Sequence, residues 1–226
     1  MKGQVRTVLF DWDGTLLDSF PAGYLASVTV LRHFGIDVDR KRFLETYSPN
    51  WYESYRLLGV PETEWDNADQ LWRRTYHQQT SELFPFAAET LERLRQAGMT
   101  LGLVTSGNRE RVLHELDRFR LHGVFSAVVC FEDTHEKKPH PAPLTRGLAQ
   151  LSAEASTAVY VGDRPEDIYM GQSVGTFTIG VESEYGPRKI LEEAAPDLVL
   201  PDASHLPETV LGSQFSVLSR QSRTER

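Results

Sequence analysis

The chain has 226 residues, of which 40% are hydrophobic and 25% are charged. This composition is typical of a folded globular protein and excludes a disordered, fibrous or membrane-embedded chain. The formal net charge of −8 disfavours nucleic acids and anionic membrane surfaces as partners.

The chain begins with a short apolar run, residues 5–10, that we interpret as a buried strand. Asp11 and Asp13 follow it directly and are succeeded by Gly14, so two carboxylates leave the sheet close together. In an extended chain their side chains point to opposite sides, whereas a turn at Gly14 can bring both to one pocket. A turn rich in aspartate, with no chemical role, is the alternative interpretation.

A connection too long for one crossover separates this strand from the next. Apolar residues recur at helical spacing in 24–34 and again in 65–76, and prolines and glycines divide the region into several helices. We therefore predict a compact helical insert over residues 18–84. Pro21 and Pro85, which interrupt the helical pattern, mark its two ends.

After the insert, short apolar runs alternate with helical segments such as 88–97. This alternation predicts a doubly wound parallel sheet with helices on both faces, an α/β fold. Ligands bind at the carboxyl ends of the strands in such sheets, so the residues after each run are candidate site residues. The remaining predicted strands are 100–104, 127–131, 157–161, 176–180 and 197–200.

Thr105, Ser106 and Gly107 follow the strand at 100–104 and precede a helical pattern. The start of a helix offers free backbone N–H groups and the positive end of the helix dipole, which suit an anion such as phosphate. Simple capping of that helix by Ser106 or Asn108 is the alternative.

Two later strands are also followed by charged residues. Lys137 and Lys138 follow the strand at 127–131, where either lysine provides a positive charge or is merely solvated. Asp163 follows the strand at 157–161, and Asp167 comes one helical turn later. Carboxylates at this spacing share a helix face and suit a hard cation such as Mg²⁺, although a solvated acidic helix start has the same pattern.

Taken together, these residues provide a nucleophile, an acid, metal ligands, hydroxyl donors and a cation, which is the set that phosphoryl transfer requires. Two unit charges ~4 Å apart repel by about 4 kcal/mol at an effective dielectric constant near 20. A carboxylate that approaches an anionic phosphate therefore needs a metal ion and a lysine beside it.

Four segments of the chain resemble, in the right order, the four motifs of the haloacid dehalogenase-like superfamily: residues 11–15, 105–106, 138–139 and 162–167. The resemblance spans about residues 5–180 and is closest to the phosphoglycolate phosphatase-like branch, which has a helical cap after the first motif. It implies a Rossmann-like catalytic core of residues 1–17 and 85–212 with an inserted helical cap of residues 18–84. We predict that the remaining residues, 213–226, form a disordered tail.

The same resemblance implies a magnesium-dependent phosphatase that hydrolyses a small phosphomonoester, such as phosphoglycolate or a sugar phosphate. Asp11 would attack phosphorus and form an aspartyl-phosphate, and Asp13 would protonate the leaving oxygen and then activate water. The implied catalytic residues are Asp11, Asp13, Thr105 and Lys138, and the implied phosphate-binding residues are Thr105, Ser106, Gly107 and Lys138. The implied Mg²⁺ ligands are Asp11, Asp13 through its carbonyl, Asp163 and, directly or through the second coordination shell, Asp167.

Other activities in the superfamily remain alternatives. Dehalogenases lack the second carboxylate, which Asp13 supplies here. Phosphonate-cleaving relatives use a cap lysine, and Lys41, the only lysine in the insert, lies in a charged run typical of an exposed surface. Phosphomutases carry a histidine just after the first motif, whereas the first histidine of this chain is His33. A catalytically silent phosphate-binding protein should have lost one of the acids, yet all are present.

Two further patterns have structural rather than catalytic interpretations. Residues 171–175 fit the G-x-S-x-G pattern of serine hydrolases, but a helical segment precedes them where that motif requires a strand. Cys130, the single cysteine, lies in an apolar strand and is expected to be an inert core thiol. With no possible internal disulfide, no signal-peptide core and no apolar stretch near ~20 residues, we expect a cytoplasmic protein, monomeric or dimeric.

Overall fold

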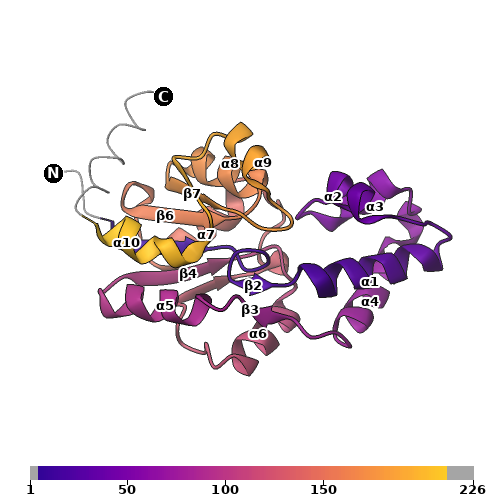
Figure 1. Ribbon diagram of the computed structural model, residues 1–226, viewed down its shortest axis with the longest axis horizontal. Coiled ribbons are helices and arrows are strands. Elements are labelled where there is room, and N and C mark those ends of the chain that lie inside the picture. Colours follow the sequence, from indigo (N-terminus) through magenta and orange to yellow (C-terminus); the bar gives the residue numbers. More distant parts are fainter. Residues whose placement is uncertain (1–4, 213–226) are drawn as a thin grey trace. The chain divides into compact units, whose positions relative to one another are not determined.

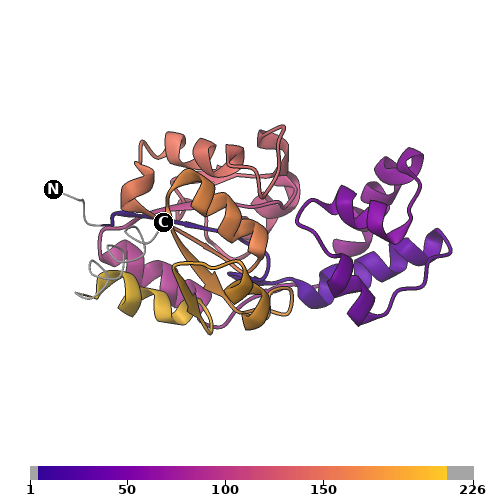
Figure 2. The same cartoon turned by 90° about the horizontal axis from the view of Figure 1, so that it is seen from above.

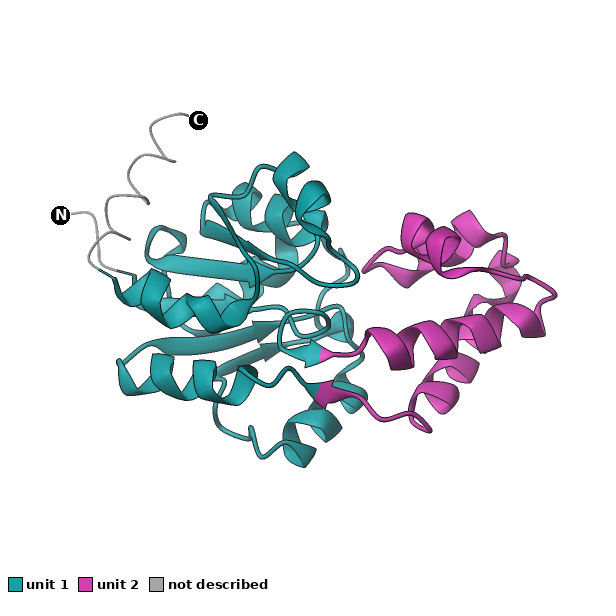
Figure 3. Cartoon of the chain, in the orientation of Figure 1, with its two compact units in different colours: residues 1–17, 83–226 teal, residues 18–82 magenta. Residues whose placement is uncertain are grey.

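The computed structural model describes residues 5–212, so the predicted tail at 213–226 lies outside the described residues. The chain divides into two compact units (Figure 3). Unit 1 comprises Met1–Leu17 and Leu83–Arg226, and unit 2 comprises Asp18–Glu82.

Unit 1 is built on a six-stranded parallel sheet with the strand order β5-β4-β1-β6-β7-β8 (Figure 1). The strands are β1 (Thr7–Phe10), β4 (Thr100–Val104), β5 (Ala127–Val129), β6 (Ala158–Gly162), β7 (Phe177–Val181) and β8 (Leu198–Leu200). In the centre, Phe10 of β1 pairs in register with Leu103 of β4 and Val161 of β6. The residues that follow these three strands therefore start from the same edge of the sheet.

Helices cover both faces of this sheet (Figure 2). Both faces are apolar because alternate residues of each strand point to opposite sides. Val8 and Phe10 of β1 belong to an apolar cluster with α5, α6 and α10, whereas Leu9 belongs to a second cluster with α7 and α8. The helices of unit 1 are α5 (Ala87–Gln96), α6 (Arg109–Arg118), α7 (Ala142–Gln150), α8 (Pro165–Val174), α9 (Arg188–Glu193) and α10 (Leu206–Leu211). This is the doubly wound α/β fold expected from the sequence.

Unit 2 consists of helices that bury their apolar faces against one another. They are α1 (Phe20–His33), α2 (Arg40–Thr46), α3 (Trp51–Leu58) and α4 (Trp65–Tyr76). Ala22 and Ala26 of α1 pack against Trp72 and Tyr76 of α4, and the Trp72 indole donates a hydrogen bond of 3.0 Å to Ser27 Oγ. A two-stranded sheet of β2 (Leu17–Asp18) and β3 (Glu82–Leu83) joins the two ends of the unit.

Two local predictions differ from the structure, and one short pairing was not predicted. Helix α1 begins at Phe20, so Pro21 lies in its first turn, where a proline fits because the N–H it lacks has no helical partner. Pro21 therefore starts a helix rather than interrupting one. The strand predicted over 127–131 ends at Val129, because the Cys130 N–H donates to Asp133 Oδ2 at 2.7 Å and the chain turns into a 3₁₀ helix. The two-residue strands β2 and β3 were too short to predict.

The structural interpretations of Cys130 and of residues 171–175 are confirmed. Cys130 is buried, and burial raises the pKa of its thiol to about 12. Ser173 lies in the last turn of α8 with a helix before it and β7 after it, which is not a nucleophile elbow. Lys41 is exposed and pairs with Glu45 at 3.9 Å. Within residues 5–212, none of the helices combines the length and apolarity needed to cross a membrane.

Candidate active site

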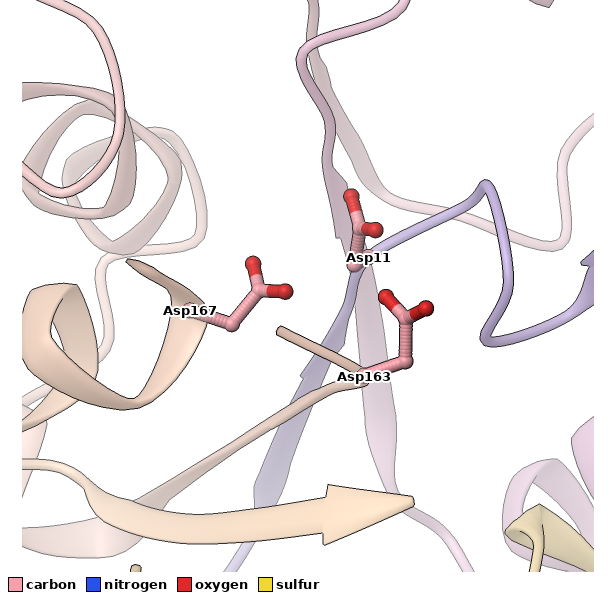
Figure 4. A group of neighbouring side chains, drawn as sticks. All are labelled: Asp11, Asp163 and Asp167. Carbon is pink, nitrogen blue, oxygen red and sulfur yellow. The ribbon is translucent and has the colours of Figure 1, made fainter. Parts of the chain in front are cut away.

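Three aspartates gather at the carboxyl edge of the sheet. Asp11 follows β1, Asp163 follows β6, and Asp167 lies in the first turn of α8. All three are buried, and one carboxylate oxygen from each lies within 4.8 Å of the others (Figure 4). We refer to these residues and Lys138 as the acid cluster.

Lys138 supplies the positive charge of the acid cluster. Its Nζ lies 2.6 Å from Asp11 Oδ1 and 2.7 Å from Asp167 Oδ1, in a side chain that is only 2% exposed. Burial alone disfavours the charged ammonium, but Asp11 and Asp167 hold the pKa of Lys138 well above its ordinary value. The Tyr160 hydroxyl, 3.1 Å from Asp167 Oδ1 and 2.9 Å from the Val104 carbonyl oxygen, closes the buried side of the cluster.

Asp163 is oriented by one hydroxyl, and one of its oxygens lacks a hydrogen-bond partner within residues 5–212. The backbone N–H groups of Tyr185 and Gly186 donate to Ser183 Oγ at 3.0 and 2.9 Å. The hydroxyl proton of Ser183 is therefore directed to Asp163 Oδ2, to which it donates. Asp163 Oδ1 is buried and has no hydrogen-bond partner among the described residues. A buried acceptor of this kind is costly unless a ligand satisfies it.

The electrostatics of the acid cluster favour a bound cation. Burial raises the pKa of Asp11 to about 7, with Lys138 opposing the rise. Burial also raises the pKa of Asp163, and the neighbouring Asp11 and Asp167 add to the effect. Carboxylate oxygens are the ligands that Mg²⁺ prefers, and Asp163 Oδ1 has no hydrogen-bond partner among the described residues that would compete with a metal ion. The residues present therefore fit the Mg²⁺ that the sequence analysis expected.

The carboxylate of Asp13 lies in a different group, which we call the Arg111 network. Arg111 donates from Nη1 to Asp13 Oδ1 at 2.9 Å and from Nη2 to Asp13 Oδ2 at 2.5 Å. Glu115 accepts from Arg111 Nη1 at 3.2 Å and from the Trp12 indole at 2.7 Å. Burial raises the pKa of Glu115, and Arg111 opposes that rise. The side chain of Asp13 thus differs in its partners from those of Asp11, Asp163 and Asp167.

The expected phosphate-binding residues follow β4, the strand beside β1. Thr105 is buried, and its Oγ1 accepts from the Gly107 N–H at 2.9 Å. Ser106 is partly exposed. Helix α6 is capped by Asn108, whose side chain accepts from the Arg111 N–H at 3.3 Å, so Ser106 has no capping role.

The two adjacent lysines have separate surroundings. Lys138 lies in the acid cluster. Lys137 donates to the carbonyl oxygens of Phe131 and Thr134, and its Nζ lies 3.9 Å from the centre of the Phe131 ring. Lys137 therefore holds the turn that precedes Lys138 and lies outside the acid cluster.

Four residues that contact the site were missed from the sequence. Arg111 and Glu115 carried a usable signal, since they stand four positions apart on the helix that follows Thr105. Tyr160 lies inside a strand, where an aromatic residue is unremarkable in sequence. Ser183 lies in a loop twenty positions beyond Asp163, and only the folded chain brings the two together.

A parallel sheet that gathers buried carboxylates after its central strands β1 and β6, with a buried lysine beside them, is typical of an α/β enzyme with an acidic active site. Residues 8–181 match the family of haloacid dehalogenase-like hydrolases, and the chain belongs to this family. The superfamily, the hydrolase class and the fold expected from the sequence are thereby confirmed.

Individual relatives agree with this assignment. Pyrophosphatase PpaX of Bacillus pumilus is 31% identical over 209 residues, covering 91% of this chain and 96% of that protein. A predicted phosphoglycolate phosphatase from Haemophilus somnus has a TM-score of 0.80 at 23% identity, covering 90% of this chain and 97% of that one. A predicted phosphatase from Clostridium acetobutylicum has a TM-score of 0.82 at 21% identity, covering 92% and 99% respectively. At these identities the two structures show the shared fold.

Proposed function

We propose that the chain is a magnesium-dependent phosphatase that hydrolyses a small phosphorylated metabolite through an aspartyl-phosphate on Asp11. The single observation that carries this proposal is the acid cluster, in which Lys138 contacts a buried Asp11 beside Asp163 and Asp167. The phosphatase names of the relatives and structural neighbours support the same chemistry.

The reaction proceeds in two displacements. An Asp11 oxygen attacks phosphorus while the bond from phosphorus to the leaving oxygen breaks, and Asp13 gives that oxygen a proton. Asp13 then takes a proton from a water molecule, which attacks phosphorus and breaks the bond to Asp11. The products are the alcohol and inorganic phosphate, with both carboxyl groups returned to their starting states.

Other residues of the site lower the cost of bringing an anion to a carboxylate. Lys138 compensates charge at Asp11, and Thr105, Ser106 and Gly107 bind the phosphoryl oxygens. Asp11, Asp163, the Asp13 carbonyl and Asp167, directly or through water, are the residues that would hold Mg²⁺. When bound, Mg²⁺ supplies positive charge that favours ionised carboxylates and offsets the charge of the phosphoryl group.

The test is phosphate release by the purified chain from a panel of phosphorylated compounds, with Mg²⁺ or with EDTA. The panel contains 2-phosphoglycolate, hexose phosphates and inorganic pyrophosphate, the last because of the name of the Bacillus relative. We expect Mg²⁺-dependent release from at least one compound. Isomerised sugar phosphate without phosphate release would instead indicate a phosphomutase, and inactivity on the whole panel would overturn the proposal.

We also propose that unit 2, the helical insert, is a cap that selects the substrate, since the core motifs bind only the phosphoryl group. A second arm of the panel uses a variant in which a Gly/Ser linker replaces unit 2. The kcat/KM values of the different compounds should become similar, so that their ratios approach one. Unchanged ratios would place specificity in the loops of unit 1.

A further inference from the structure

The carboxylate of Asp13 is held at both oxygens by one guanidinium. The two contacts from Arg111, at 2.9 and 2.5 Å, form the planar bidentate arrangement that fixes a carboxylate most firmly. The Asp13 side chain is 19% exposed, whereas that of Arg111 is 8% exposed. Arg111 therefore contacts the Asp13 carboxylate from the buried side, and Asp13 is the more exposed of the two residues.

Arg111 is itself fixed by its surroundings. Nη1 lies 3.2 and 3.3 Å from the two oxygens of Glu115, and the buried Trp12 indole donates to Glu115 Oε2 at 2.7 Å. A series of hydrogen bonds thus runs from Trp12 through Glu115 and Arg111 to Asp13, the next residue in the chain. A Cβ at Gly107 would lie 2.5 Å from Arg111 Nη2, so the absence of a side chain there makes room for the guanidinium.

We propose that Arg111 is a positioning residue for Asp13, which fixes the carboxylate in the orientation required for proton exchange with the leaving oxygen. This inference rests on the proposed function, in which Asp13 is the acid and base. An aspartate on a loop has two free side-chain torsions, and the two Arg111 contacts restrict both of them. A misplacement of about 1 Å can cost on the order of a hundredfold in rate.

A purely structural role has a different expectation. A buried ion pair is weak evidence for stability, because desolvation offsets much of the attraction. If Arg111 served only to hold the fold, its replacement would affect all substrates alike. If it positions the acid, the loss should depend on how much the leaving oxygen needs a proton.

The experiment compares an alkyl phosphate, whose leaving oxygen requires protonation, with p-nitrophenyl phosphate, whose leaving group departs unassisted. The variants are Arg111→Lys, which retains the charge without the fork, and Arg111→Met with Glu115→Gln, which avoids leaving the buried Glu115 carboxylate without its cation. We expect the ratio of kcat/KM for alkyl over p-nitrophenyl phosphate to fall on the order of ten- to a hundredfold in the double variant. Arg111→Lys should recover part of it.

Arg109→Met is the matched control, because Arg109 lies on the same helix and pairs with Asp133 rather than Asp13. This variant should lose stability in thermal melts without a change in the ratio. Equal losses on both substrates in the Arg111 variants, or faster turnover of the alkyl phosphate, would overturn the inference. If wild type hydrolyses p-nitrophenyl phosphate, the proposed function holds and these outcomes test the inference alone. If wild type hydrolyses neither substrate, the proposed function fails and the inference fails with it.

Discussion

The acid cluster and the Arg111 network both combine carboxylates with a single cation, but the charge balance of the two groups differs. When ionised, Asp11, Asp163 and Asp167 leave two negative charges in excess of Lys138, and Asp163 Oδ1 lacks a partner among the described residues. In the Arg111 network, the guanidinium contacts both Asp13 and Glu115, which leaves one negative charge in excess when both are ionised. The larger excess of negative charge, together with the unsatisfied Asp163 Oδ1, suits a group that binds a cation, whereas a guanidinium paired with both carboxylates suits a group that holds geometry.

The largest difference between the two groups should appear when Asp11 is replaced. Asp11→Asn removes the proposed nucleophile, so turnover should fall by several orders of magnitude, whereas the Arg111 variants should retain activity on p-nitrophenyl phosphate. Phosphate release measures the effect, and circular dichroism verifies the fold. Residual activity above about 1% of wild type would contradict a covalent role for Asp11.

The second-largest difference between the two groups should appear in the affinity for Mg²⁺. Asp163→Asn removes a ligand charge, so the dissociation constant for Mg²⁺ should rise by at least about tenfold. The metal-free melting temperature should rise, because a crowded buried carboxylate becomes neutral. Isothermal titration calorimetry and thermal melts measure both effects. Glu115→Gln is the matched control, a buried acid of the Arg111 network, and an equal loss of Mg²⁺ affinity there would contradict the division between the two groups.

The smallest expected effect is a pH dependence of stability without metal. Burial raises the pKa of Asp11 to about 7, so the folded chain retains a proton that the unfolded chain releases near its ordinary pKa of about 4. The metal-free melting temperature should therefore fall as the pH rises from about 4 towards 7. Stabilisation by Mg²⁺ should grow over the same range, because ligands must lose protons to bind. Thermal melts with EDTA or Mg²⁺ test this, and Asp11→Asn should flatten the metal-free curve.

Much of the fold could be predicted because strand burial and helix periodicity are local signals. Strand β4 and helix α4 begin and end where the sequence patterns placed them. The errors arose where one hydrogen bond decides the outcome, as at Cys130, or where a residue has two opposite uses, as with Pro21. The short pairing of β2 with β3 joins distant segments and has no periodic signal.

The candidate site was predictable only as far as strand ends identify it. Asp11 and Asp163 were found because each directly follows an apolar run. Partners that arrive from elsewhere in the chain, such as Arg111 and Ser183, depend on side-chain directions that spacing does not fix. The different surroundings of Asp11 and Asp13, two positions apart, likewise became clear only from the folded chain.

The pairing of β2 with β3 has a consequence for how such proteins diversify. Unit 2 begins after Leu17 and ends before Leu83. Next to this second junction, the Phe84 N–H donates to the Leu16 carbonyl oxygen at 3.0 Å. Because both junctions of the insert are hydrogen-bonded neighbours, a gene segment of different length can replace it without moving the strands that carry Asp11 and Thr105. Under the proposed function, exchange of the insert at these two junctions would change the part that selects the substrate and leave the catalytic core in place.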